Sequence, residues 1–210
     1  MKKLHGALFG VMAFAIAGEA LAASPQMKIA AYPPAATQAA IGGETKVPIG
    51  WIDFCSRYRR ECNFTPAATK EVQMSPQIWR LLNRVNNEVN AAIEPVTDID
   101  HWGVAERWDF AEDGRGDCED YVLVKRRALI EAGLPPQALL VTIVRDKKDL
   151  GHAVLMVKTD RGDFILDNQE APILPWTATG YRFTKRQSQD NPNRWVDLLG
   201  GPAPAATAAR

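Results

Sequence analysis

The chain has 210 residues, and its 25 lysines and arginines are balanced by 25 aspartates and glutamates. Because the formal net charge is zero, nothing in the overall charge indicates nucleic acid or an anionic membrane surface as a partner. The length is sufficient for one domain with a sizeable hydrophobic core.

The N-terminal segment is typical of a secretory signal peptide. Two lysines precede an apolar stretch from Ala7 to Ala17, and the small-x-small sequence ALA follows at Ala20–Ala22, as in the charged, apolar and cleavage regions of an export signal. The apolar stretch is too short to cross a bilayer comfortably, and no second long apolar stretch follows it. We expect residues 1–22 to be a signal peptide and the mature protein to have no stable membrane insertion. A retained membrane tether is the alternative.

Composition divides the rest of the chain into three parts. Residues 23–50 are rich in alanine, proline and glycine and lack a sustained period, which predicts an extended arm or loop. Residues 51–199 contain the aromatic and periodic segments, and we assign them to a single domain. Residues 200–210 are of low complexity and are predicted to be disordered.

All three cysteines lie beyond the predicted signal peptide. In an oxidising compartment an odd number of cysteines leaves one thiol unpaired. Cys55 and Cys62 flank the short segment SRYRRE, which allows a local disulfide and would leave Cys118 free. The alternative is that Cys55 and Cys62 are buried thiols that pack as small apolar side chains.

A strong helix is predicted after Ser75. Ser75 suits the N-cap and Pro76 the first helical position, and apolar residues then recur at helical spacing as far as Ile93. Pro95 should end this helix. The polar stretch that follows, residues 98–116, is predicted to be a loop.

A second helix is predicted to begin at Asp117. Asp117 can serve as N-cap, with Asp120 at the third helical position completing a variant of the capping box. Val122, Leu123 and Leu129 continue at helical spacing, and the sequence AGLPP supplies the glycine and prolines that typically follow a helix.

The second half of the domain has the pattern of strands. The segments are ALLVTIVRD, HAVLMVKT, DFILDN and YRFTKRQ, separated by turn sequences such as KKDLG and DRG. Helices followed by an antiparallel sheet indicate the α+β class.

The cysteine at the start of the second helix has acidic neighbours. Asp117, Glu119 and Asp120 crowd Cys118, and nearby negative charge disfavours a thiolate. The first turn of a helix has the opposite effect, because its unpaired N–H groups and dipole favour negative charge. These two effects oppose each other, so the sequence leaves the direction of the thiol pKa shift open.

A histidine and an aspartate are predicted to meet on the sheet. His152 opens a strand directly after a turn. If residues 152–159 and 163–168 form a hairpin with an even-numbered loop, cross-strand partners have an odd sum of residue numbers, and Asp167 shares a face with His152. An acid there can orient the imidazole, as in nucleophile–base–acid triads. The alternatives are an ordinary strand-edge histidine and an aspartate that caps a turn.

Two segments, GDCEDYVLVKRRALIEAGLP and GHAVLMVKTDRGDFILDN, resemble the bacterial transglutaminase-like cysteine peptidases. With the upstream segments WIDFCSRYRREC and IWRLLNRVNNEVN, the resemblance spans about Trp51 to Trp195. It implies a papain/transglutaminase-like α+β fold, in which the cysteine at a helix start packs on an antiparallel sheet that carries the histidine and the acid. Position by position, it implies Cys118 as nucleophile, His152 as base and Asp167 as orienting acid.

The resemblance also implies a metal and partners. The calcium-binding acids of the family fall on Asp117 and Glu119, with Asp120 an expected additional ligand. Hard oxygen ligands suit Ca²⁺, and a bound dication would turn a repulsive neighbourhood for the thiolate into a supportive one. The LapG-type members are calcium-dependent periplasmic proteases that release biofilm adhesins, and an inner-membrane receptor that senses cyclic di-GMP sequesters them.

From these observations we expect a periplasmic calcium-dependent cysteine endopeptidase that cleaves a cell-envelope or surface protein, with a large adhesin as candidate substrate. Acyl transfer to an amine is one alternative, because it begins with the same thioester. A non-catalytic calcium-responsive binding module is another. A zinc site made of Cys118, His101 and His152 is a weaker alternative, because the chain lacks the spacings CxxC and HxxxH around these residues.

Overall fold

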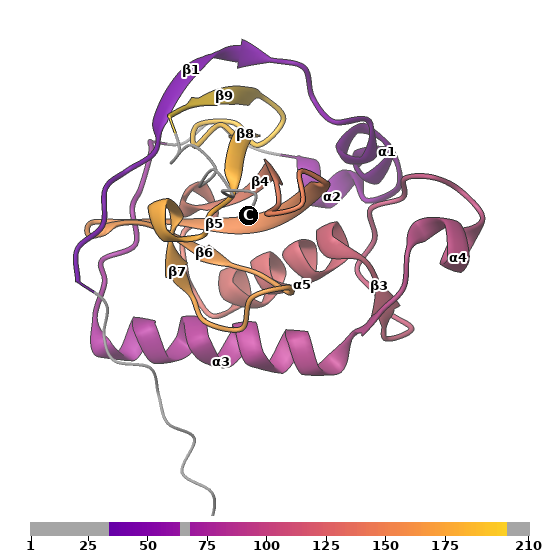
Figure 1. The fold of residues 1–210 in the computed structure, drawn as a ribbon, viewed down its shortest axis with the longest axis horizontal. Helices are drawn as coiled ribbons and strands as arrows, with labels where there is room; N and C mark the ends of the chain where they lie inside the picture. The colour runs from indigo at the N-terminus through magenta and orange to yellow at the C-terminus, as the bar shows by residue number, and fades with distance from the viewer. Residues whose placement is uncertain (1–33, 64–67, 201–210) are drawn as a thin grey trace, which may run out of the picture.

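The computed structural model describes residues 34–63 and 68–200 (Figure 1). The predicted signal peptide, and residues 201–210 of the predicted disordered tail, lie outside the described residues, so both stay predictions. Among the residues that the structure describes, no helix is long and apolar enough to cross a membrane.

The domain combines helices with one large antiparallel sheet. The α-helices are α1 (Ile49–Arg57), α2 (Arg59–Cys62), α3 (Pro76–Ala92), α4 (Asp98–Trp102) and α5 (Cys118–Glu131). The strands of the large sheet are β1 (Ala40–Thr45), β4 (Leu139–Arg145), β5 (Gly151–Thr159), β6 (Gly162–Leu166), β7 (Leu174–Pro175), β8 (Arg182–Gln187) and β9 (Trp195–Leu199). Their order is β1-β9-β8-β4-β5-β6-β7, and all neighbours are antiparallel. The predicted α+β class is confirmed.

Shorter elements complete the chain. β2 (Glu94–Pro95) and β3 (Arg115–Gly116) form a two-stranded parallel sheet, and the 3-10 helices η1 (Pro136–Ala138) and η2 (Trp176–Ala178) precede β4 and β8. The β2–β3 pair joins the end of α3 to the start of α5, so it sets where α5 begins.

Helix α5 lies between α3 and the sheet (Figure 1). Its apolar residues Val122, Leu123 and Leu129 are 2% exposed or less, and polar residues of the same helix are buried as well. A helix that is covered on most sides is expected to be buried around its circumference. The first turn of α5 is therefore held rigidly by packing from two layers.

Helix α3 has the predicted cap and a predicted apolar face. The Oγ of Ser75 accepts the backbone N–H of Ile78 at 3.2 Å, and Pro76 is the first helical residue. Trp79 and Leu82 bury their side chains against the core. The helix ends at Ala92, slightly before the predicted stop at Pro95, because the chain turns into β2 there.

Two segments differ from the sequence-based expectation. The arm predicted for residues 23–50 contains the edge strand β1 and the start of α1, because β1 finds its partner in the distant strand β9. The loop predicted for residues 98–116 contains helix α4, which is capped by the Thr97 side chain and ended by Gly103 at φ 72°. Positive φ at this position favours glycine.

Cys55 and Cys62 are joined by a disulfide, with their Cα atoms 5.5 Å apart. The bond links α1 to α2, the pair that the sequence predicted for a local bridge. The remaining cysteine, Cys118, is free.

Candidate active site

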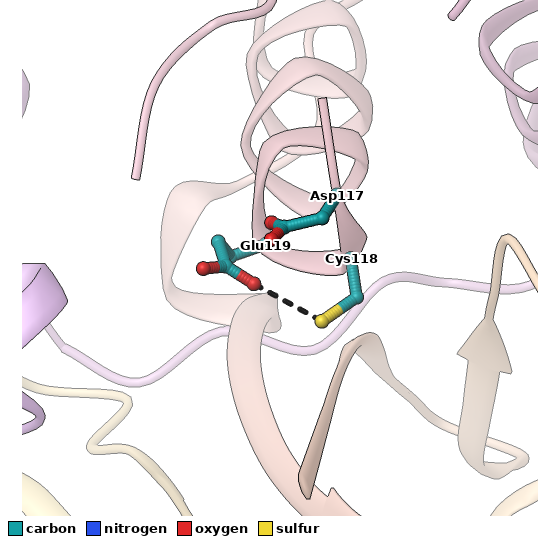
Figure 2. A group of neighbouring side chains, drawn as sticks. All are labelled: Asp117, Cys118 and Glu119. Carbon is teal, nitrogen blue, oxygen red and sulfur yellow. Dashed lines mark hydrogen bonds between the residues drawn. The ribbon is translucent and has the colours of Figure 1, made fainter. Parts of the chain in front are cut away.

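The free thiol lies at the start of the central helix. Cys118 is the first residue of α5 and follows the N-cap Asp117. Its Sγ donates to Glu119 Oε2 at 3.0 Å (Figure 2) and accepts the backbone N–H of Ala153, in β5, at 3.4 Å. The sulfur thus lies between the helix start and the strand that carries His152.

The helix start is tightly built. The backbone N–H of Asp117 donates to Asp120 Oδ2 at 3.2 Å, which is the half of the predicted capping box that Asp120 supplies. A Cβ on Gly116 would collide with this carboxylate, so only glycine fits before the cap. The backbone of Cys118 is therefore fixed by its neighbours on both sides.

The direction of the thiol pKa shift, which the sequence left open, is upward in the structure. Burial raises the pKa of the Cys118 thiol well above its usual range, and the negative charge of Glu119 raises it further. The N–H of Ala153 acts in the opposite direction but is weaker. Both burial and the neighbouring acids therefore disfavour the thiolate in this arrangement.

His152 and Asp167 form a buried pair. His152 Nε2 and Asp167 Oδ1 are 2.8 Å apart, and the two residues are 3% and 2% exposed. The pairing of Leu155 with Leu166 across β5 and β6 has the odd sum of residue numbers expected for the hairpin. The parity argument therefore placed both side chains on the correct face.

The carboxylate of Asp167 is held by further donors. Its Oδ2 accepts the hydroxyl of Tyr181 at 2.6 Å, and its Oδ1 accepts the backbone N–H of Gln169 at 3.0 Å. Burial acts to raise the pKa of Asp167, but the hydrogen bond and charge of His152 and the Tyr181 hydroxyl hold it below its usual range. Asp167 is thus an ionised partner for the imidazole.

The other imidazole nitrogen faces Gln169. Because Nε2 is paired with Asp167, Nδ1 of His152 is the nitrogen left to exchange a proton with a nucleophile, and the Nε2 of Gln169 lies 3.3 Å from it. No hydrogen bond joins Cys118 to His152 in the described part of the chain. The thiol and the imidazole are brought to the same region, yet each is held by another partner.

The acidic cluster extends beyond the three predicted residues. Carboxylate oxygens of Asp98, Asp117 and Asp120 lie within 4.8 Å of one another, as do ligand atoms of Asp117, Cys118 and Glu119. Asp98 is the first residue of α4, and its backbone N–H donates to Asp117 Oδ2 at 3.3 Å. Asp98 was not among the predicted site residues, because residues 98–116 were expected to form a loop.

Mutual repulsion is visible in the pKa values of this cluster. Burial, followed by the charge of Asp117, raises the pKa of Glu119 to about 9. Burial also raises the pKa of Asp120 to about 8 and that of Asp98 to about 6, in both cases with a contribution from Asp117. Without a cation, burial and mutual repulsion therefore disfavour the ionised forms of these acids.

One oxygen of the cluster fits a cation ligand. Asp117 Oδ1 is buried and has no hydrogen-bond partner, which is unusual for a buried carboxylate. Asp120 is a poorer candidate, because its two oxygens accept the N–H groups of Asp109, at 2.6 Å, and Asp117. Hard, clustered carboxylate oxygens with one of them unpartnered are a suitable donor set for Ca²⁺.

The zinc alternative is not supported. His101 Nε2 pairs with Asp113 Oδ2 at 2.8 Å and the ring stacks on Trp102. Among residues 34–63 and 68–200, the groups with metal-ligand geometry that include Cys118 contain carboxylates and no histidine.

The chain matches the family model of the bacterial transglutaminase-like cysteine proteinases over residues 41–202. The chain belongs to this family. It is accordingly a cysteine peptidase, and the predicted family and enzyme class are confirmed. The match begins before the predicted limit of resemblance at Trp51 and takes in most of β1.

Solved structures of similar fold come from LapG of Legionella pneumophila. The calcium-bound form has a TM-score of 0.51 and 23% identity, over 64% of this chain and 77% of that chain. A second LapG structure has a TM-score of 0.49 and 25% identity, over 62% of this chain and 73% of the other. The EGTA-treated form has a TM-score of 0.49 and 26% identity, over 59% of this chain and 69% of that chain. The calcium-bound form shows the shared fold. No curated protein matches the chain.

Besides Asp98, two further residues of the site were not predicted from the sequence. Tyr181 lies just before β8 and reaches Asp167 across the sheet, and Gln169 lies just after the Asp167 that it contacts. Tyr181 was visible only as the first residue of a strand pattern. Gln169 was two residues from Asp167, and this proximity was the one available signal.

Proposed function

We propose that this cysteine peptidase is an exported calcium-dependent endopeptidase that uses Cys118, His152 and Asp167 to cleave a protein of the cell envelope. The observation that carries the proposal is the buried pair of His152 and Asp167, placed beside a free thiol at a helix N-terminus. This is the arrangement of a nucleophile, a base and an orienting acid.

The proposed chemistry follows from the imidazole nitrogen of His152 that is not paired with Asp167. His152 Nδ1 takes the proton of the Cys118 thiol, and the sulfur attacks the carbonyl carbon of the scissile peptide bond. Nδ1 then donates this proton to the leaving amine, and a thioester remains. Water attacks the thioester as Nδ1 accepts its proton, which releases the new carboxyl end and restores the thiol. Asp167 keeps Nε2 protonated throughout, and so keeps Nδ1 available.

The helix start offers a donor for the negative oxygen that develops on the attacked carbonyl. The backbone N–H of Cys118 is one of the first N–H groups of α5, which have no partner within the helix. Such a preorganised donor is typical of an oxyanion hole.

Two rearrangements are required before the chemistry. The thiol must exchange Glu119 for His152 Nδ1, and Gln169 must leave that nitrogen. Asp117 and Glu119 would hold a calcium ion, with Asp98 as a further candidate and Asp120 mainly as a helix cap. When bound, calcium supplies positive charge that neutralises this cluster. The calcium-bound structure of Legionella LapG supports the choice of metal.

The proposals about export and about partners rest on the predicted signal peptide and on the resemblance to the family. The N-terminal sequence and the Cys55–Cys62 disulfide both fit an oxidising compartment outside the cytoplasm. By resemblance to LapG-type proteases, the proposed location is the periplasm, the proposed substrate is a large surface adhesin, and the proposed regulator is an inner-membrane receptor for cyclic di-GMP.

The test uses the mature chain and a purified fragment of a surface adhesin from the same organism. The fragment is incubated with enzyme in calcium or chelator, and with a fluorescent primary amine, and the products are identified by mass spectrometry. Calcium-dependent cleavage that leaves a free carboxyl end supports the endopeptidase. Amine-labelled product supports acyl transfer, and an intact fragment together with a thiol that no probe can alkylate supports a binding module. Either of the last two results overturns the proposal.

A further inference from the structure

The catalytic helix carries a lysine in the hydrophobic core. Lys125 is 0% exposed, and its Nζ has no hydrogen-bond partner. Burial lowers the pKa of this amine to about 7, although the charge of Asp167 acts in the opposite direction. A buried amine without a partner is strongly unfavourable, and an apolar side chain of the same length would suit the core better.

The surroundings of Lys125 place it at the contact between α5 and α3. Its Nζ lies 5.8 Å from the ring centroid of Tyr121, one turn earlier, and the Tyr121 hydroxyl donates to the carbonyl of Ile93, at the end of α3, at 2.6 Å. The two helices run in opposite directions (Figure 1). Because Tyr121 reaches the end of α3, Lys125, one turn further along the same face of α5, faces the turns of α3 that precede Ile93.

The same turns of α3 hold the loop that carries the catalytic acid. Asn90 donates its Nδ2 to the carbonyl of Asp167 at 2.8 Å, and Asn86 donates its Nδ2 to the carbonyl of Ala171 at 3.1 Å. Both ends of the segment 167–171 are thus tied to α3 by carboxamides.

These carboxamides have unused acceptors. The Oδ1 atoms of Asn86, Asn90 and Asn168 are buried and have no hydrogen-bond partner. A lysine ammonium has three donors and no acceptor, which complements such a group. Because no direct hydrogen bond joins Lys125 to these oxygens, buried water is the connection that would satisfy both sides, and such water typically makes about three hydrogen bonds to otherwise unpaired groups.

We infer that Lys125 is a positioning residue for the proposed catalytic acid. Through buried water and the carboxamides of Asn86 and Asn90, it links the helix that carries Cys118 to the segment 167–171. The nucleophile and the acid lie on different layers of the fold, and this link fixes one relative to the other. The positive charge also favours the ionised carboxylate of Asp167. The inference rests on the proposed roles of Cys118 and Asp167.

The main test is Lys125→Met, which keeps the length of the side chain and removes its charge and donors. We expect a folded protein with an unchanged or raised melting temperature, a kcat lowered roughly tenfold or more, and a KM within about twofold of the original. The control is Leu129→Met, one turn further along α5 and equally buried, for which kcat should change little.

Two further measurements separate positioning from packing. The proton between His152 and Asp167 should give a downfield signal in the proton NMR spectrum that is lost or broadened in Lys125→Met and kept in Leu129→Met. Asn90→Leu should reproduce the loss of kcat, and the double variant should lose no more than the worse single variant, because both changes break one link. Asn90→Leu also covers the case in which Lys125→Met fails to fold, because it breaks the same proposed link from the side of α3.

Normal kcat and a normal downfield signal in Lys125→Met would overturn the inference, as would losses that multiply in the double variant. The NMR signal, and the rate at which iodoacetamide alkylates Cys118, need no protein substrate. If the adhesin fragment is not cleaved by the unaltered enzyme, the proposed substrate fails while the role of Lys125 is still decided by these two readouts.

Discussion

The hydroxyl of Tyr181 should make a measurable and pH-dependent contribution to stability. It donates to Asp167 Oδ2 at 2.6 Å, and Tyr181 is 1% exposed while Asp167 is 2% exposed. Tyr181→Phe keeps the ring, whose centroid lies 5.7 Å from that of His152, and removes only the donor. Hydrogen bonds to charged groups contribute about 1.5–3 kcal/mol, which corresponds to a fall in melting temperature of about 3–12 °C for a domain of this size.

The pH dependence follows from the direction of the Asp167 shift. Its pKa in the folded protein is held below the ordinary value, so its stabilisation is complete above the ordinary pKa of an aspartate and is lost as the pH falls through the folded value. The difference between the original protein and Tyr181→Phe should therefore be largest near about pH 7 and shrink toward about pH 3.

The matched control is Tyr121→Phe. The hydroxyl of Tyr121 donates to the neutral carbonyl of Ile93 at the same distance of 2.6 Å, so its removal should lower stability by about 0.5–1.5 kcal/mol with little dependence on pH. Urea unfolding of the three proteins across this pH range provides the measurement. Equal, pH-independent losses in both variants would show that Asp167 is not an ionised acceptor, and the reasoning about the acid would fail.

Cys118→Ala should abolish cleavage with the fold intact, because alanine fits a helix start, and His152→Ala should be nearly as damaging; normal cleavage by either variant would refute the proposed roles. Thiol titration of denatured, unreduced protein should find one free thiol, because Cys55 and Cys62 are bonded, whereas three would exclude the bridge. Chelation should lower activity without unfolding, and added calcium should restore activity and raise the melting temperature as its concentration exceeds the dissociation constant. Glu119→Gln should weaken this calcium response, and an unchanged calcium affinity would remove Glu119 from the ligand set.

The parts of the fold that could be predicted are those with local signals. Ser75 and Pro76 marked the start of α3, Asp117 marked the start of α5, and short apolar runs separated by turn sequences marked β4 to β6. Because a two-residue turn fixes the parity of a hairpin, the pairing of His152 with Asp167 could also be inferred without the structure. These inferences needed no information beyond neighbouring residues.

The parts that could not be predicted depend on contacts between distant segments. β1 is a short edge strand that contains two glycines, and only its pairing with β9 makes it a strand. Tyr181 reaches Asp167 from the start of another strand, and Asp98 joins the acidic cluster from a helix that is a single short turn. A buried lysine at position 125 is indistinguishable in sequence from a lysine on the exposed face of an amphipathic helix.

The position of Cys118 shows why a sequence motif does not by itself define an active nucleophile. The motif supplies the proposed nucleophile, base and acid. The fold places Cys118 against β5, which carries His152, and pairs His152 with Asp167. Yet the thiol donates to Glu119, and His152 Nδ1 is met by Gln169. Both contacts must break before the proton can pass from the thiol to the imidazole. The acid in the first contact is Glu119, whose pKa is raised by burial and by the charge of Asp117. Burial and the neighbouring acids both disfavour the Cys118 thiolate, and a bound cation would oppose the acidic contribution, which is the physical reason to expect a peptidase that responds to calcium.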